Sequence, residues 1–258
     1  MPDILRGLSV VVTRPASQAA GFQHLLGEAG ATAVLFPVIA IVPPENQAVA
    51  KAVLAGLDAY DTAIFISANA VRFGLELLDE TLQQCLRRLV IGAVGKQTAE
   101  ALQQCGYPVQ WVPGGAFTSE AFLALPETQQ LAGRRILIFR GEGGRELLAE
   151  SLQRRGASVD YVEVYRRVRP KIDANCLKQR HKQQQLDIIA ITSSEGLLNL
   201  LAMLDNPDWI KTVPLLVGSQ RIGETARQTG FTGSIVIADN PSDKAMMQAL
   251  SHWVQECQ

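Results

Sequence analysis

The sequence predicts an α/β protein with two similar parallel-sheet domains that are related by an internal duplication. Two observations predict this fold class. Patterns of buried strands alternate with helical patterns along the chain, and the second half of the chain repeats features of the first. A length of 258 residues suffices for two ordinary domains. A hydrophobic content of 47% is enough to build their cores and excludes a disordered chain.

Short apolar runs have the length and the β-branched content of buried strands. Their hydrophobicity is continuous and does not alternate, which is typical of parallel strands covered by helices on both faces. These runs occupy residues 8–12, 62–66, 89–94, 136–139, 186–191, 213–217 and 234–238.

Stretches with helical periodicity lie between these runs. A strand that is followed by a helix and then by another strand predicts parallel pairing with right-handed crossover connections. The expected helices occupy residues 17–29, 69–79, 96–105, 144–155, 195–204 and 220–229.

The two halves of the chain match at an offset of 126 residues. The segment LSVVVTRP corresponds to RRILIFRG, and HLLGEAGA corresponds to ESLQRRGA, without a gap. Residues 94–107 also parallel residues 217–231, at an offset of 123 to 124. A register held over more than fifty positions predicts a duplicated α/β unit. The pairs at the offset of 126 include Arg14 with Arg140, Gly30 with Gly156, Pro44 with Pro170, and Ser67 with Ser193.

Strand-to-helix junctions rich in small and hydroxylic residues recur in both halves. In an open parallel sheet these junctions lie at the carboxyl ends of the strands, where ligands bind. Helix N-termini present unpaired N–H groups and a partial positive charge, so matched sets of them favour an anionic ligand. Alternatively, each junction only caps its helix. The junctions are 13–17, 67–70 and 95–98 in the first half, and 140–144, 193–196 and 218–221 in the second.

The overall charge gives no support for nucleic acid or an anionic membrane as a partner. The chain has 24 Lys and Arg residues and 25 Asp and Glu residues, for a formal net charge of −1. Such a chain lacks the strong positive field that these partners attract, although a local basic groove could exist within the neutral total. No apolar stretch is long enough to span a membrane.

The scattered cysteines and histidines predict reduced thiols and no metal site. The spacings between them contain no CxxC pair and no Cys/His pair of metal-binding type. Because the first apolar run leads into TRP without a cleavage motif, we expect a cytoplasmic protein. The residues concerned are Cys85, Cys105, Cys176, Cys257, His24, His181 and His252.

Motifs of several common catalytic sites are missing from the sequence. VGKQTAEAL lacks the phosphate-binding pattern GxxxxGK[ST], and RGEGG lacks the spacing of a dinucleotide fingerprint. No GxSxG is present. We therefore expect chemistry that uses neither a nucleophilic side chain nor a metal.

A succession of motifs resembles the uroporphyrinogen-III synthase family. The individual strings are short, but their order and spacing agree with the family along essentially the whole chain. They are VTRPASQAAGFQHLLGEAGA, FPVIAIVPP, FISANAVRF, VGKQTAEAL, VEVYRRVRP, ITSSEG and SQRIGETARQTGF.

The resemblance implies a discontinuous α/β domain and an inserted one, with the active site in a cleft between them. The first would comprise residues 1–38 plus 170–258 and the second residues 39–169. Two extended linkers, at about 36–44 and 162–170, would connect the domains and act as hinges. Both linkers carry prolines and occupy equivalent places in the repeat.

The resemblance also implies a reaction. The family cyclises hydroxymethylbilane, a linear tetrapyrrole, to uroporphyrinogen III, with inversion of the last pyrrole ring and loss of water. It uses no cofactor, and a cleft enzyme of this size has no need of a second chain, so we expect a monomer. The substrate carries many carboxylates, which helix N-termini and a few arginines would hold.

Tyr165 matches the tyrosine that the family places at the cleft. A phenol is protonated at neutral pH, so Tyr165 is our candidate for the donor that helps the substrate hydroxyl leave as water. Alternatively, it is an aromatic residue packed on an interdomain strand, with a structural hydroxyl.

Thr98 matches a family threonine at the head of a cleft helix, where it would bind substrate or serve as a first-turn hydroxyl. The second half departs from the family pattern and reads GSQRIGETA, so Ser219 with Arg221 would supply the equivalent contact. Arg14 and Arg140 would each pair with a substrate carboxylate, or else be solvated surface residues.

The remaining candidate residues lie at the same junctions. Ser67, Asn69, Ser193 and Ser194 would act mainly through neighbouring amides, and Lys96 would either face the cleft or lie on the surface. The other expected binding residues are Thr13, Ala68, Gly95, Gln97, Gly141 and Gln220. A second hypothesis is a non-catalytic, hinge-closing binder of a small polyanion, because a fold alone does not assign a function.

Overall fold

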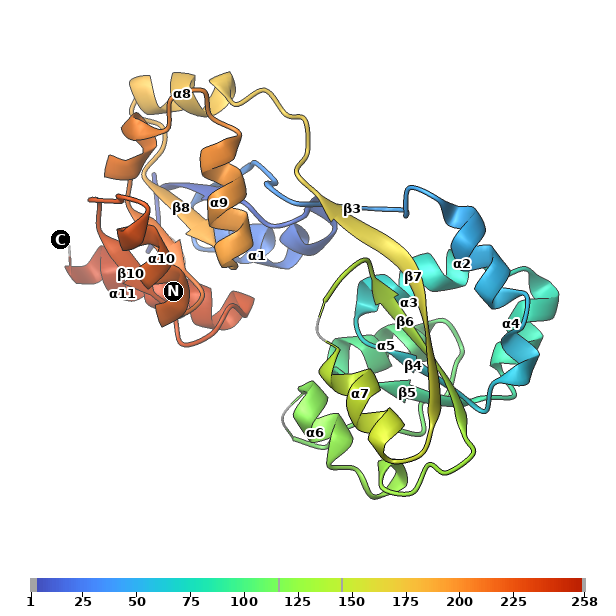
Figure 1. Ribbon diagram of the computed structural model, residues 1–258. Coiled ribbons are helices and arrows are strands. Elements are labelled where there is room, and N and C mark those ends of the chain that lie inside the picture. Colours follow the sequence, from blue (N-terminus) through green and yellow to red (C-terminus); the bar gives the residue numbers. More distant parts are fainter. Residues whose placement is uncertain (1–3, 116, 145, 257–258) are drawn as a thin grey trace. The chain divides into compact units, whose positions relative to one another are not determined.

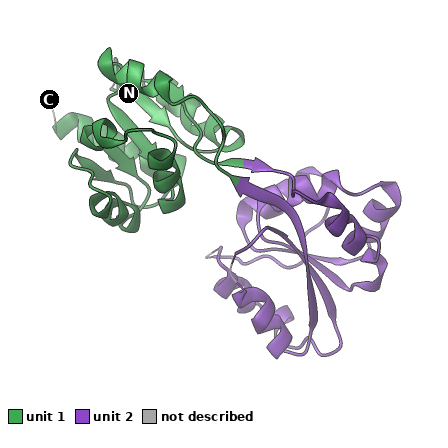
Figure 2. Ribbon diagram, turned by 45° about the horizontal axis from the view of Figure 1, so that its top comes forward, with its two compact units in different colours: residues 1–40, 168–258 green, residues 41–167 purple. Residues whose placement is uncertain are grey.

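The computed structural model describes residues 4–115, 117–144 and 146–256, and its contacts divide the chain into two units (Figure 2). Unit 1 comprises Met1–Ala40 and Val168–Gln258, and unit 2 comprises Ile41–Arg167. The boundaries implied by the family resemblance differ from these by two residues.

Unit 1 contains a five-stranded sheet in the order β10-β9-β8-β1-β2, and these strands pair in parallel. Figure 1 labels β8 and β10 of this sheet. Numbered along the chain, this order is 2-1-3-4-5, one of the two common orders of doubly wound α/β domains. The strands are β1 (Ser9–Val12), β2 (Thr32–Leu35), β8 (Ile188–Ile191), β9 (Leu215–Val217) and β10 (Ile235–Ile237). The helices are α1 (Ala16–Glu28), α8 (Asn175–Lys182), α9 (Ser194–Ala202), α10 (Gln220–Gln228) and α11 (Asp243–Glu256).

Unit 2 contains a second five-stranded sheet, in the order β3-β7-β6-β4-β5. Strands β4 to β7 pair in parallel within it. The strands are β3 (Ala40–Val42), β4 (Thr62–Phe65), β5 (Val90–Ala93), β6 (Arg135–Gly141) and β7 (Ser158–Val168). The helices are α2 (Gln47–Leu54), α3 (Ala68–Glu76), α4 (Glu80–Leu86), α5 (Lys96–Gln104), α6 (Ser119–Leu123) and α7 (Leu147–Arg154).

The two sheets share a spatial order when strands are matched by the sequence offset. In unit 1 the order β9-β8-β1-β2 corresponds to β5-β4-β6-β7 in unit 2. A parallel bridge between Gly92 and Trp111 continues the second sheet beside β5, at the place that β10 occupies in the first. The predicted α/β class with parallel sheets is confirmed, while the internal duplication stays a prediction.

Both faces of each buried strand pack against helices, as the continuous apolar runs predict. In β4, Phe65 contributes to a core that includes residues of α2, α3 and α5. The adjacent Ile64 faces the opposite core, which includes residues of α6 and α7. Stacking of Phe65 on Phe139 of β6, with ring centroids 4.3 Å apart, joins the two central strands of unit 2.

One predicted helix begins later than expected. The sequence pattern placed a helix at 144–155, directly after the strand, but α7 begins at Leu147. Gly143 and Gly144 have φ angles of +69° and +116°, which lie outside the helical region, so the RGEGG junction is a loop and not a helix start.

Among the described residues, no helix is long and apolar enough to cross a membrane. The same residues contain no group of three or more His, Cys, Asp and Glu side chains that could hold a metal ion. Cys85, Cys105 and Cys176 are free thiols, and Cys257 lies outside the described residues.

Candidate functional site

The candidate site in unit 2 lies where the chain order of the sheet reverses. Strands β4 and β6 are adjacent, while β5 follows β4 on one side and β7 follows β6 on the other. At such a switch point the loops after the two central strands diverge and leave room for a ligand at the carboxyl edge. The residues at this edge are Ser67 after β4, Arg140 and Gly141 at the end of β6, and Tyr165 on β7.

A cavity of about 330 Å³ opens at this edge. Its lining combines apolar side chains, two tyrosines, two arginines and the backbone of the glycine-rich loop 141–144. Two other cavities, near β10 with α11 and near α8, include none of the predicted site residues. Residues lining the first cavity include Ile66, Val94, Ser119, Arg140, Leu148, Tyr161, Tyr165 and Arg167.

Tyr165 is held rigidly at the cavity wall. It is only 3% exposed, and its ring stacks against Phe73 of α3 with centroids 6.0 Å apart. A Cβ atom at Gly141 would lie 2.6 Å from the Tyr165 ring, so only glycine fits beside it. The Tyr165 hydroxyl lies 3.2 Å from Ser67 Oγ.

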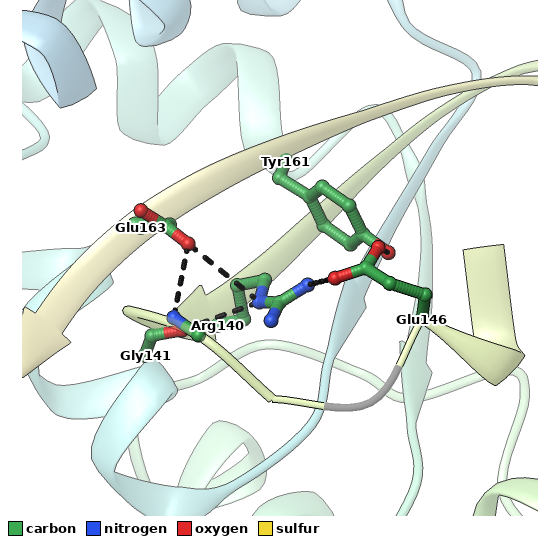
Figure 3. A network of polar contacts seen from close by, with 6 residues as sticks. Arg140, Gly141, Glu146, Tyr161 and Glu163 are labelled. Atoms are coloured by element: carbon green, nitrogen blue, oxygen red, sulfur yellow. Dashed lines mark hydrogen bonds and ion pairs between the residues drawn. The ribbon is translucent and has the colours of Figure 1, made fainter.

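Arg140 is buried, with 3% of its surface exposed, and the chain's own carboxylates hold it (Figure 3). Its Nη1 donates to Glu146 Oε1 at 3.0 Å, and its Nε lies 3.9 Å from Glu163 Oε1. The guanidinium also lies 4.3 Å from the Tyr161 ring centroid. The alternative that Arg140 is a solvated surface residue is therefore wrong. A substrate carboxylate would have to compete with Glu146 and Glu163 for the guanidinium.

The arginine network fixes the glycine-rich loop. Arg140 Nε donates to the carbonyl of Gly141, and the N–H of Gly143 donates to Glu163 Oε1 at 3.3 Å. Glu146 accepts from the Tyr161 hydroxyl at 2.5 Å. The hydrogen bonds from Tyr161 and then Arg140 keep the pKa of Glu146 below its ordinary value.

Alkaline titration tests this network through Tyr161. Burial, followed by the hydrogen bond and charge of Glu146, raises the pKa of Tyr161 from 10.0 to about 12. Protonated Tyr161 therefore stabilises the folded protein. This stabilisation is complete below pH 10.0, the pKa of a tyrosine in the unfolded chain, and is lost as the pH rises towards about 12. We expect the tyrosinate absorbance step near pH 12 to disappear in Tyr161→Phe and to move to lower pH in Glu146→Gln. An unchanged titration curve in both variants would contradict the network.

The starts of α3 and α5 complete the carboxyl edge of unit 2. Ser67 caps α3, because its Oγ accepts from the N–H of Ala70 at 3.1 Å. Gly95 is the N-cap residue of α5, and Thr98 is buried in the first turn. Lys96 is exposed and pairs with Glu100 of the same helix, as the surface alternative predicted. Ala68, Asn69 and Gln97 lie in the first turns of these two helices.

Unit 1 has a corresponding edge at the ends of β1, β8 and β9. Thr13 is buried, and its hydroxyl donates to the carbonyl of Ala190 at 2.6 Å. Arg14 forms an ion pair with Asp243 and donates to the carbonyl of Pro241. With 11% of its side chain exposed, Arg14 is not the solvated arginine of the alternative, and it ties β1 to the start of α11.

The Arg14 pair should contribute to the stability of unit 1. We expect Arg14→Met to lower the free energy of unfolding by about 1–3 kcal/mol, because Asp243 would lose its charged partner in a partly buried place. The control is Lys96→Met, which breaks an exposed pair and should cost less than about 0.5 kcal/mol. Urea unfolding measures both losses, and equal losses would contradict a structural role for Arg14.

The helix starts after β8 and β9 contain the remaining predicted residues. Ser193 caps α9, with its Oγ 2.9 Å from the N–H of Gly196. Ser194 Oγ lies 3.2 Å from Thr225 Oγ1, which joins α9 to α10. Ser219 occupies the N-cap position of α10 but makes no cap hydrogen bond with its side chain, so the capping alternative does not hold for this side chain. Gln220 and Arg221 are exposed in the first turn of α10.

Sequence reasoning missed four residues at the site in unit 2. Tyr161 and Arg167 lie on β7 with Tyr165, and all three line the cavity. Alternation along the sequence does not indicate this grouping, because the pairing of β6 with β7 shifts register between Arg140 and Gly141. Glu146 and Glu163 are separated from Arg140 by 6 and 23 residues, and no local pattern links them to it.

Comparisons with known proteins match the chain over almost its full length. The sequence profile of the family described as uroporphyrinogen-III synthase HemD matches residues 20–248. The uroporphyrinogen-III synthase of Escherichia coli K12 is 32% identical over 246 residues, which are 94% of this chain and 100% of the relative. The same enzyme of Salmonella typhimurium LT2 is 33% identical over 247 residues, with the same coverage.

Two solved structures agree in fold. A mutant uroporphyrinogen III synthase from the extremely thermophilic bacterium Thermus thermophilus superposes with a TM-score of 0.60 at 20% identity, and covers 96% of this chain and 99% of its own. The protein titled uroporphyrinogen-III synthetase from Helicobacter pylori 26695 gives 0.61 at 17% identity, with coverages of 95% and 99%. At these identities the likeness concerns the fold.

Proposed function

Because the chain belongs to the uroporphyrinogen-III synthase family, we propose that it cyclises hydroxymethylbilane to uroporphyrinogen III with inversion of the last pyrrole ring and loss of water. The observation that carries the proposal is the family match over residues 20–248, together with relatives covered along their whole length. Tyr165 at the wall of a cavity supports it with a suitable proton donor.

The reaction begins with the loss of the substrate's terminal hydroxyl. The pyrrole nitrogen pushes electron density towards the carbon that carries the hydroxyl, and an azafulvene cation forms as water leaves. Proton donation to the leaving oxygen accelerates this step, and we assign it to the Tyr165 phenol. The substituted carbon of the last ring then attacks this cation to give a spiro intermediate, which opens and closes again with that ring inverted.

The protein's main task is to hold the substrate in the conformation that leads to attack at this carbon. We assign the substrate carboxylates to backbone N–H groups at the starts of α3, α5, α9 and α10, where the helix dipoles favour anions. Arg14 and Arg140 are held by carboxylates of the chain, so we assign them to the positioning of the adjacent loops.

We also propose that the enzyme acts as a monomer in the cytoplasm and without nucleic acid. The cavity with Tyr165 is lined by residues of unit 2 alone, which supports a site that needs no second chain. Sedimentation equilibrium at assay concentration should give the mass of one chain.

The rate of substrate loss tests the proposed function against simple binding. Hydroxymethylbilane is generated by its own synthase, and this chain is then added in substoichiometric amounts. An enzyme accelerates the loss of the linear substrate over many turnovers. A binder would hold the linear form and slow its spontaneous closure, so the two functions predict changes of opposite sign.

A further inference from the structure

The Ser67 hydroxyl has two partners in unit 2. Its oxygen accepts the N–H of Ala70, which caps α3 at 3.1 Å. The same oxygen lies 3.2 Å from the Tyr165 hydroxyl oxygen, and either hydroxyl can be the donor in this second bond. The direction of that bond decides where the Tyr165 hydrogen points.

The hydrogens of the two hydroxyls allow two arrangements. A serine hydroxyl has one hydrogen to donate and two lone pairs to accept. The cap occupies one lone pair, and within the described residues Tyr165 Oη is the one acceptor in hydrogen-bond distance of the Ser67 hydrogen. If Tyr165 donates, its hydrogen points to Ser67, and if Ser67 donates, the Tyr165 hydrogen is left for the cavity that Tyr165 lines. Only the second arrangement lets Tyr165 donate to a substrate in the cavity.

We propose that Ser67 is the donor in this bond and thereby a positioning residue that leaves the Tyr165 hydrogen free to point into the cavity. Donation from Ser67 occupies a lone pair of the phenol oxygen and turns its hydrogen away from α3. The ring itself cannot move to compensate, because it is packed between Phe73 and the backbone of Gly141. This inference rests on the proposed function, in which Tyr165 protonates the leaving hydroxyl.

The matching serine in unit 1 shows that capping alone does not require the second bond. Ser193 lies 126 residues after Ser67 and caps α9 in the same way, with its Oγ 2.9 Å from the N–H of Gly196. In the portion of the chain that the structure describes, no tyrosine hydroxyl bonds to Ser193. The contact with a phenol is thus an addition specific to unit 2.

The bond also stabilises the state that forms during the reaction. As the carbon–oxygen bond breaks, its electron pair goes to the leaving oxygen, which takes the Tyr165 proton and departs as water. The phenolate that remains accepts the Ser67 hydrogen bond, which is stronger to an ionised oxygen than to a neutral one. Ring closure later releases one proton from the pyrrole carbon that forms the last bond, so the phenol is restored without net change.

Kinetics of Ser67 variants test the inference. We expect Ser67→Ala to lower kcat about tenfold, the effect of one lost hydrogen bond to a developing charge, with KM changed less than about twofold. Ser67→Thr keeps both the cap and the donor and should retain kcat within about threefold. The control is Asp79, whose Oδ1 caps α4 by accepting the Leu82 N–H at 2.9 Å. Asp79→Ala removes this comparable cap and should leave kcat unchanged.

A double variant separates positioning from a loss of structure. In a Tyr165→Phe background there is no phenol to position, so Ser67→Ala should lower kcat no further. If the two losses multiply, or if Thr fails to restore kcat, the positioning role is overturned. That outcome differs from failure of the proposed function, in which the unsubstituted protein itself would not accelerate the loss of hydroxymethylbilane.

Discussion

Tyr165→Phe is expected to lower kcat about 10- to 100-fold while KM changes less than about threefold. The substitution removes one oxygen from a ring that packing holds in place, so the cavity keeps its shape. A general acid acts on the transition state more than on the bound substrate, and its removal therefore reduces kcat more than binding. Initial rates of uroporphyrinogen formation over a range of hydroxymethylbilane concentrations separate the two constants.

Tyr60→Phe is the matched control for this substitution. This substitution also removes one hydroxyl, which in Tyr60 donates to Asp160. Tyr60 is not among the residues that line the cavity. Its kcat should equal that of the unsubstituted protein. A Tyr165→Phe enzyme with full kcat would remove the tyrosine from the mechanism, and the Ser67 inference with it.

Gly141→Ala should disturb the site from the other side of the Tyr165 ring. The added Cβ would lie 2.6 Å from two ring carbons, far inside van der Waals contact, so the ring or β6 must move. We expect a loss of about 1–3 kcal/mol in the free energy of unfolding. We also expect kcat to fall about as far as in Tyr165→Phe, because a displaced phenol no longer reaches the leaving group.

Gly114→Ala is the control, because a Cβ there meets no atom within 4 Å. It should change neither stability nor kcat appreciably. Replacing Tyr165 by alanine in the Gly141→Ala protein removes the ring that clashes. When residue 165 is alanine, Gly141→Ala should lower the free energy of unfolding much less than it does in the presence of Tyr165. An equal loss in the two backgrounds would show that the contact with the Tyr165 ring does not cause the destabilisation.

The central elements of the fold could be predicted because each has a strong local signal. Strands such as β4 and β8 are buried on both faces and read as unbroken apolar runs. The edge strand β2 has no fully buried residue, and β7 carries charges along its length, so neither gave a clear pattern. The start of α7 was misplaced because the positive φ angles of Gly143 and Gly144 have no signature beyond glycine itself.

The candidate site was predicted in part. The strand ends with Ser67, Arg140 and Gly141 followed from the junction pattern, and Tyr165 followed from the family resemblance. The ion pairing of Arg140 could not be predicted from the sequence, because the pairing of β6 with β7 brings its partner Glu163 next to it. The Ser67–Tyr165 contact spans 98 residues and likewise depends on the order of strands in the sheet.

The composition of the product tests the proposed function most directly. Hydroxymethylbilane closes spontaneously to isomer I, in which the last ring is not inverted, so the fraction of isomer III reports control by the protein. The products are oxidised to porphyrins and the isomers separated by chromatography. The account predicts that isomer III predominates in the presence of catalytic amounts of this chain, and formation of isomer I alone would contradict it.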